Sequence, residues 1–205
     1  MLVAGLTGGI GSGKTTFAFL LAERGASIID ADALGRDALR PARPAWHSVV
    51  GQFGDEILQP NSMEIDRKRL AAIVFASPHK LAALNAIVHP VIIKEIADRL
   101  ERFARTNEVV VLDAALIAEL GLEESLDVLI AVTAPQAVRQ RRLERARDMD
   151  PTDIQARMDS QMDPAEVAAR ADIVVRNDGR LEDLVGEADR VWAELERLRD
   201  AKRSS

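Results

Sequence analysis

A glycine-rich segment near the start of the chain lies between a short apolar run and a longer segment with helical periodicity. It reads Gly8-Gly9-Ile10-Gly11-Ser12-Gly13-Lys14-Thr15, which matches the pattern GxxxxGK(S/T). Glycine allows the backbone to curl until successive N–H groups face one space, and the positive end of a following helix faces it too. The segment therefore predicts a phosphate-binding loop (P-loop), in which Lys14 reaches the β- and γ-phosphates of a nucleotide and the Thr15 hydroxyl coordinates Mg²⁺.

Two other interpretations of this segment are weaker. A glycine-rich turn that binds nothing would match four specified positions only rarely by chance. A Rossmann dinucleotide loop requires GxGxxG. Its third glycine would fall on Lys14 if the pattern began at Gly9, and on Thr16 if it began at Gly11. The spacing therefore excludes the dinucleotide loop.

Five short apolar runs alternate with longer helical segments along the chain. Nearly continuous apolar runs are typical of strands whose two faces are both covered by helices. The runs span 2–6, 27–29, 109–112, 128–132 and 173–175, and the helical segments span 14–24, 70–105, 135–147 and 181–199. The sequence predicts an α/β fold with a parallel five-stranded sheet flanked by helices.

Two stretches interrupt the alternation. Residues from about 36 to 106 show helical patterns without a convincing strand and are too long for a simple crossover. Residues from about 139 to 163 are charged, rich in arginine and broken by proline, as in a helical hairpin. We expect a nucleotide-binding core (1–60, 107–138 and 170–205), a helical acceptor-binding excursion (61–106) and a small helical lid (139–169).

Composition argues against several other classes of protein. The chain has no cysteine and three scattered histidines, which argues against disulfides and transition-metal sites. Its net charge of −6 does not favour nucleic acid as a partner. No apolar stretch reaches about 18 residues and no basic leader precedes the first apolar run, so we expect a cytoplasmic protein without a membrane partner. Nothing in the sequence implies an obligate protein partner.

Two aspartates, Asp30 and Asp32, follow the second apolar run. Ligands of an open parallel sheet bind at the carboxyl ends of its strands, so these carboxylates are expected beside the γ-phosphate. A carboxylate there can accept a proton from an attacking hydroxyl or hold a magnesium-bound water. Either residue could instead serve as a helix N-cap.

Further segments follow the glycine loop in a specific order and spacing. They are DADALGR at 30–36, Phe53-Gly54, Ile57-Leu58, Asp66-Arg67, Phe75, Val88-His89-Pro90, Arg142-Leu143, Arg157 with Gln161, Ala171-Asp172 and Asn177-Asp178-Gly179. Together with GLTGGIGSGKTT, they closely resemble the bacterial dephospho-CoA kinase family over about residues 2–190. The resemblance implies a P-loop NTPase-like kinase that uses Mg²⁺ and ATP to phosphorylate the ribose 3′-hydroxyl of dephospho-CoA, the last step of coenzyme A biosynthesis. The alternatives are a P-loop kinase acting on another small acceptor, such as a nucleotide or sugar, and a nucleotide-binding switch that does not catalyse.

The resemblance also implies roles for individual residues. ATP contacts are expected from Gly9, Ile10, Gly11, Ser12, Gly13, Lys14, Thr15, Thr16, Arg142 and Asn177. Substrate contacts are expected from Asp30, Arg67, His89, Asp113 and Leu116, although a His-Pro pair taken alone more often marks a helix boundary. Catalysis is expected from Asp32 as proton acceptor, from Lys14 and from Arg147. The metal is expected at Thr15 and, through water, at Asp32.

The chain departs from the family pattern in two places. The arginine that usually follows Arg142 by four residues is replaced by Ala146, which Arg145 and Arg147 flank. Arg147 is the one expected to act in the lid; the alternatives are Arg145 in that role and a solvated, arginine-rich helix. The apolar run that ends in Asp113 has the form of a Walker B strand, suited to a magnesium-bound water. After it, alanines at 115 and 118 replace the usual proline and aromatic residue.

Overall fold

The computed structural model describes the whole chain except residues 107, 115–116, 118–119, 148–157, 159–163 and 205. The chain divides into two compact units. One comprises Met1–Ile29 with Glu101–Ser205, and the other is Asp30–Leu100. The first contains nearly all of the sheet and the second is helical.

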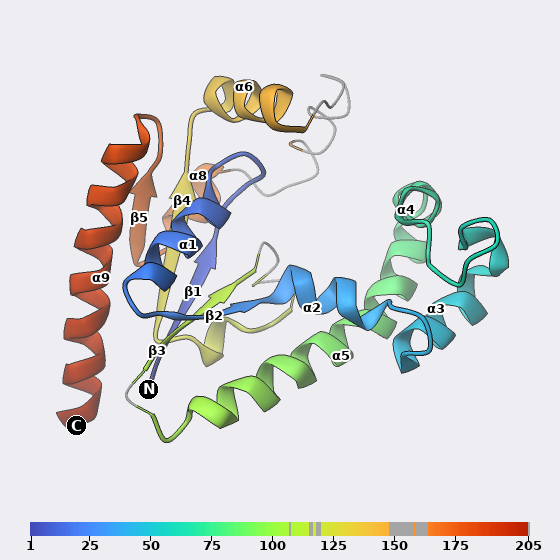
Figure 1. Ribbon diagram of the computed structural model, residues 1–205, viewed down its shortest axis with the longest axis horizontal. Coiled ribbons are helices and arrows are strands. Elements are labelled where there is room, and N and C mark those ends of the chain that lie inside the picture. Colours follow the sequence, from blue (N-terminus) through green and yellow to red (C-terminus); the bar gives the residue numbers. More distant parts are fainter. Residues whose placement is uncertain (107, 115–116, 118–119, 148–157, 159–163, 205) are drawn as a thin grey trace. The chain divides into compact units, whose positions relative to one another are not determined.

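Five strands form one sheet in the order β2-β3-β1-β4-β5 (Figure 1). They are β1 (Leu2–Thr7), β2 (Ser27–Asp30), β3 (Val109–Asp113), β4 (Val128–Thr133) and β5 (Ile173–Arg176). The central strand β1 runs parallel to β3 on one side and to β4 on the other, and β4 runs parallel to β5. The predicted five-stranded α/β fold is confirmed, and each strand lies within one residue of its predicted bounds.

Helices cover both faces of the sheet, because successive strand residues point to opposite faces and nearly all of them are apolar. Among the described residues of this unit, the helices are α1 (Lys14–Glu23), α6 (Gln136–Arg147), α8 (Pro164–Arg170) and α9 (Leu181–Ser204), with a 3₁₀ turn η2 (Glu123–Ser125). On one face α1 and α9 lie side by side and pack against a single buried cluster from four of the strands (Figure 1). On the other face Leu126 approaches β1 so closely that a Cβ at Gly5 would overlap it.

The helical unit contains α2 (Ala31–Ala38), α3 (Pro44–Phe53), a 3₁₀ turn η1 (Asp55–Ile57), α4 (Arg67–Phe75) and most of α5 (Pro78–Phe103). As predicted from about residue 36 onward, the rest of this unit holds no strand, only an isolated bridge between Leu58 and Ile65. The prediction of a single helix over 70–105 is wrong, because the helix is interrupted at Ser77, just before Pro78. Proline disfavours helix for the residue before it and suits the first turn of a new one.

A second proline, Pro90, lies inside α5 without ending it. The interpretation of His89-Pro90 as a helix boundary is therefore wrong. The apolar side chains of Val88, Ile92 and Ile96 are buried on both sides of the proline. Burial of that stripe at helical spacing favours a continuous helix over the local preference of proline.

The boundary between the units differs from the expected core and excursion, because residues 30–60 group with the helical unit. The reason is local packing: α2 contacts α3, and α3 and α4 both contact η1. The functional division into core, acceptor domain and lid stays a prediction.

Across the described part of the chain, no helix is long and apolar enough to cross a membrane.

Candidate active site

The glycine loop connects β1 to α1 in a backbone conformation that requires glycine at two positions. Gly11 and Gly13 have φ of +78° and +93°, values that L side chains rarely adopt. Within the loop the Ser12 N–H donates to the Gly9 carbonyl at 3.0 Å. The loop thus folds tightly before the first turn of α1.

The first turn of α1 is suited to an anion. Gly13 is the N-cap and provides no side-chain hydrogen bond, and no acidic residue occupies the first turn. A helix N-terminus of this kind presents N–H groups and a partial positive charge. The loop and helix together form the arrangement that binds phosphate in P-loop proteins. Thr15 and Thr16 are exposed at this end of α1.

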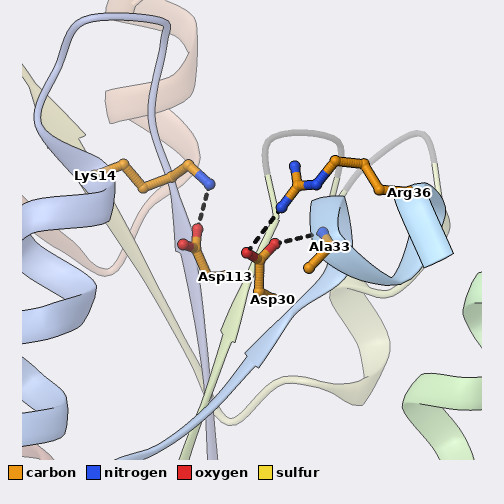
Figure 2. A network of polar contacts seen from close by, with 5 residues as sticks. All are labelled: Lys14, Asp30, Ala33, Arg36 and Asp113. Atoms are coloured by element: carbon orange, nitrogen blue, oxygen red, sulfur yellow. Dashed lines mark hydrogen bonds and ion pairs between the residues drawn. The ribbon is translucent and has the colours of Figure 1, made fainter. Parts of the chain in front are cut away.

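Lys14 forms an ion pair with Asp113, whose carboxylate accepts a hydrogen bond from Lys14 Nζ (Figure 2). The two side chains are 12% and 8% exposed, so the pair is largely shielded from water. Strand pairing explains the contact, because Leu6 near the end of β1 lies opposite Asp113 at the end of β3. The sheet therefore brings a carboxylate to the entrance of the loop.

The Ser12 carbonyl accepts hydrogen bonds from two side chains that lie far away in the sequence. Asn177 Nδ2 donates to it at 2.7 Å and Arg142 Nη1 donates at 3.4 Å. Arg142 Nη2 also donates to Asn177 Oδ1 at 3.1 Å. The chain thus links the loop, helix α6 and the turn after β5 in one network.

The arginines of α6 do not share one environment. Arg139 is 6% exposed, and its backbone and Cβ lie against Gly11. Arg142 is half-buried, whereas Arg141 and Arg145 are exposed. The interpretation of the run as a solvated surface thus holds for the two exposed residues and is wrong for Arg139, which packs under the loop.

The structure leaves the side chains of two predicted site residues undescribed. Arg147 ends α6, but its side chain is not described, and Leu116 lies outside the described residues. Their expected roles in the lid and at the substrate stay predictions.

In the helical unit Asp30 is the N-cap of α2. Its Oδ1 accepts from the Ala33 N–H at 2.7 Å, and its Oδ2 lies 3.4 Å from Arg36 Nη2 (Figure 2). The capping interpretation is confirmed for Asp30. It is wrong for Asp32, which lies inside the first turn of α2 and is exposed.

The same unit contains a cavity of about 510 Å³ with a basic lining. Asp66 caps α4 by accepting from the backbone of Lys68 and Arg69, and this places Arg67 and Lys68 at the start of the helix. His89 is half-buried on α5. The cavity is lined by Arg36, Leu39, Arg40, Pro41, Gln59, Glu64, Ile65, Asp66, Arg67 and Lys68.

Around the loop the structure brings together Lys14, Asp113, Arg142 and Asn177, all predicted from the sequence. The sequence interpretation missed the pairing of Lys14 with Asp113 and the burial of Arg139. A signal for the second exists: positions 139, 142 and 143 are spaced as one inward-facing stripe of a helix. Within the described residues, no cluster of three or more histidine, aspartate or glutamate side chains could hold a metal.

Comparison with known proteins identifies the family. A sequence model of the dephospho-CoA kinase family matches residues 2–183. A dephospho-CoA kinase from Anaeromyxobacter dehalogenans is 43% identical over 95% of this chain and 92% of its own length. A second, from Thermobifida fusca, is 42% identical over 96% of this chain and 98% of its own.

Solved structures agree with the sequence relatives. The crystal structure of TT1252 from Thermus thermophilus is similar with a TM-score of 0.82 at 34% identity, covering 95% of this chain and 97% of that one. Dephospho-CoA kinase from Campylobacter jejuni has a TM-score of 0.71 at 25% identity, with the same coverage. A shikimate kinase from Bacteroides thetaiotaomicron (TM-score 0.53, 15% identity, 95% and 98% coverage) shares the fold. The chain belongs to the dephospho-CoA kinase family.

Proposed function

We propose that the chain transfers the γ-phosphoryl group of ATP to the ribose 3′-hydroxyl of dephospho-CoA and releases CoA and ADP. One observation carries the proposal: the glycine loop leads into a helix N-terminus that has neither an acidic residue nor a side-chain cap, with Lys14 in its first turn. This arrangement binds phosphate groups. Membership in the family, whose relatives are named dephospho-CoA kinases, supports the choice of acceptor.

In the proposed step the 3′-oxygen of the acceptor forms a bond to the γ-phosphorus, and the bond from that phosphorus to the β–γ bridging oxygen breaks. ADP leaves with the electron pair of the broken bond. The hydroxyl proton passes to the carboxylate of Asp32, which the structure does not use as a helix cap. Lys14 stabilises the negative charge on the phosphate oxygens. Arg147 of the lid is proposed to add a second positive charge.

The side chains beside the loop fit magnesium as a companion of ATP. Magnesium prefers hard oxygen ligands and keeps several waters. Thr15 offers an exposed hydroxyl and Asp113 a buried carboxylate at the end of β3, and Asp32 could hold a bound water. When bound, the ion would supply charge neutralisation at the phosphates.

The basic cavity of the helical unit supports binding of an anionic acceptor. Dephospho-CoA carries a pyrophosphate, and Arg67, Lys68 and Arg40 line the cavity with positive charge. Arginine recognises phosphate through paired N–H donors. We assign the pyrophosphate of the acceptor to this cavity, with Asp30 and His89 as further contacts to the substrate.

The test is product formation by the purified protein. With Mg·ATP and dephospho-CoA, mass spectrometry should detect CoA, and the ADP released should equal it. Nucleoside monophosphates, shikimate and gluconate should give at least about 100-fold less ADP. Formation of ADP with one of these acceptors and none with dephospho-CoA would reject the proposed acceptor.

A matched pair of variants tests the role of Asp32. Asp32→Asn removes the basic carboxylate, and we expect kcat to fall by about 10²–10⁴-fold. Asp98→Asn is the control, because Asp98 is a half-buried aspartate of α5 that forms an ion pair with the surface residue Lys94. Retention of more than about a third of kcat by Asp32→Asn would exclude Asp32 as the proton acceptor.

A further inference from the structure

The Asn177 side chain uses both ends of its amide at the back of the phosphate loop. Its Nδ2 donates to the Ser12 carbonyl at 2.7 Å, and its Oδ1 accepts from Arg142 at 3.1 Å. Its backbone N–H donates to the Thr133 carbonyl at 2.8 Å, which ties the residue to the end of β4. Asn177 is 6% exposed. The side-chain amide is therefore held at both of its ends, and the backbone of the residue is held at a third point.

The contact with the loop is steric as well as polar. Gly13 has φ of +93°, and a Cβ at this position would overlap Asn177 Nδ2. Gly13 is also the N-cap of α1, and its carbonyl accepts the first hydrogen bond of the helix, from the Phe17 N–H at 3.0 Å. The amide of Asn177 thus lies against the residue at which the loop becomes the helix.

Only a side chain that both donates and accepts can make this set of contacts. Carboxylate oxygens only accept, so an aspartate could keep the contact with Arg142 but not the one with the Ser12 carbonyl. Arg142 adds a second, longer hydrogen bond to the same carbonyl at 3.4 Å. Because Arg142 belongs to α6, the loop and the proposed lid helix are joined through one carbonyl oxygen.

We propose that Asn177 and Arg142 brace the phosphate loop in the conformation that binds nucleotide, with Asn177 as a positioning residue that acts through the loop backbone. The proposal rests on the proposed function, since the ligand of the loop is taken to be Mg·ATP. It gives Asn177 a role other than the direct contact with ATP that the sequence predicts. The N–H groups that receive the phosphates are held from behind by the amide of Asn177.

The test compares Asn177→Asp with the unchanged protein. This substitution keeps the size of the side chain and the oxygen facing Arg142, and it replaces the donor to the Ser12 carbonyl with an acceptor. We expect the Kd for Mg·ADP, measured by calorimetry below the melting temperature, to rise about 10- to 50-fold. The Kd for dephospho-CoA should change by less than about threefold, and hydrogen exchange should speed up in the peptide 9–15.

A double-mutant cycle tests whether the two side chains act together. Arg142→Gln removes the second donor, and Arg190→Gln is its control because Arg190 lies on the surface of α9 and pairs with Glu187. If one brace is shared, the double variant should bind Mg·ADP within about threefold of the weaker single variant. Should Asn177→Asp not fold, Arg142→Gln alone must weaken Mg·ADP binding and speed exchange in the loop.

Three results would overturn the proposal. One is an Mg·ADP affinity of Asn177→Asp within about threefold of the unchanged protein. Another is equal weakening of Mg·ADP and dephospho-CoA, which indicates general loss of structure. The last is a double variant whose Kd for Mg·ADP rises by the product of the two single fold-changes, as expected for side chains that act independently. The readouts are the affinity for Mg·ADP and hydrogen exchange in the loop. They therefore test the proposal even if dephospho-CoA proves to be the wrong acceptor.

Discussion

The ion pair between Lys14 and Asp113 makes a specific prediction about nucleotide binding. In the structure Lys14 Nζ donates to the Asp113 carboxylate, yet the proposed function requires this lysine to reach the phosphates. The pair must then weaken when nucleotide binds. Asp113→Asn keeps the shape of the side chain and removes its charge, so the lysine is released more easily.

The magnitude follows from the burial of the pair. The two side chains are only 12% and 8% exposed, and a hydrogen bond to a charged group contributes about 1.5–3 kcal/mol. The asparagine oxygen can still accept a weaker bond, so we expect about half of this to be lost. At 1.4 kcal/mol per factor of ten, Mg-free ADP should bind about 3- to 12-fold more tightly. The melting temperature of the nucleotide-free protein should fall by about 2–6 °C.

Calorimetry in EDTA measures the affinity without magnesium. The control is Asp127→Asn, because Asp127 forms an ion pair with Lys202 and accepts from the Val3 N–H. This variant should also melt earlier, but its affinity for ADP should not rise. An affinity of Asp113→Asn for Mg-free ADP that is unchanged or weaker would show that the pair does not compete with phosphate.

Three further predictions concern other parts of the chain. Lys14→Ala should remove nearly all kinase activity while the circular dichroism spectrum is retained, and a folded variant with full activity would refute its place at the phosphates. Arg67→Gln should raise the KM for dephospho-CoA about tenfold and that for ATP by less than about twofold; a larger effect on ATP would remove Arg67 from the acceptor site. The Arg197 guanidinium donates to Glu194 and lowers the pKa of that carboxyl. The lowered pKa means that the pair stabilises the fold above the ordinary carboxyl pKa and less as the pH falls through the folded value. Arg197→Gln should therefore raise the pKa of Glu194 in an NMR titration, and an unmoved pKa would contradict this cause.

The sheet could be predicted because each strand is a nearly continuous apolar run, which both covered faces of a parallel sheet require. The break between α4 and α5 could not be predicted with the same ease. Apolar residues continue at helical spacing up to Phe75 and resume after Pro78, so periodicity alone joins the two helices. The position of Pro90 shows the opposite case, in which buried apolar contacts outweigh the local preference of proline.

The boundary of the two compact units at Asp30 does not follow from the sequence pattern, for a different reason. Asp30 ends β2 and also caps α2, so one residue belongs to the sheet and to the helical unit. A sequence pattern shows the cap but not the elements that α2 and α3 pack against. The basic cavity could not be predicted for the same reason. Arg36 and Arg67 belong to different helices, and they line one cavity only after the chain has folded.

The alternation of side chains along the strands explains why two polar residues near the loop, Asp113 and Asn177, lie on the same face of the sheet. Val109 and Val111 belong to the cluster that packs against α1 and α9, so Asp113, two residues further on, continues the same face. Val175 belongs to the same cluster, and Asn177 likewise follows two residues later. Both polar side chains therefore emerge on the face covered by α1, one on each side of β1.

Because side chains alternate between the two faces of a strand, the positions of Asp113 and Asn177 depend on the apolar residues that precede them. A shift of β3 by one residue would turn Val109 and Val111 away from α1 and would move Asp113 to the opposite face. The buried cluster opposes such a shift because it would expose apolar side chains to water. The same packing that stabilises the sheet thus sets the carboxylate beside Lys14 and the amide behind Ser12. Lys14 lies 99 positions from Asp113, and Ser12 lies 165 from Asn177. Local motif patterns give each residue separately, and only the order and register of the strands bring them to one loop.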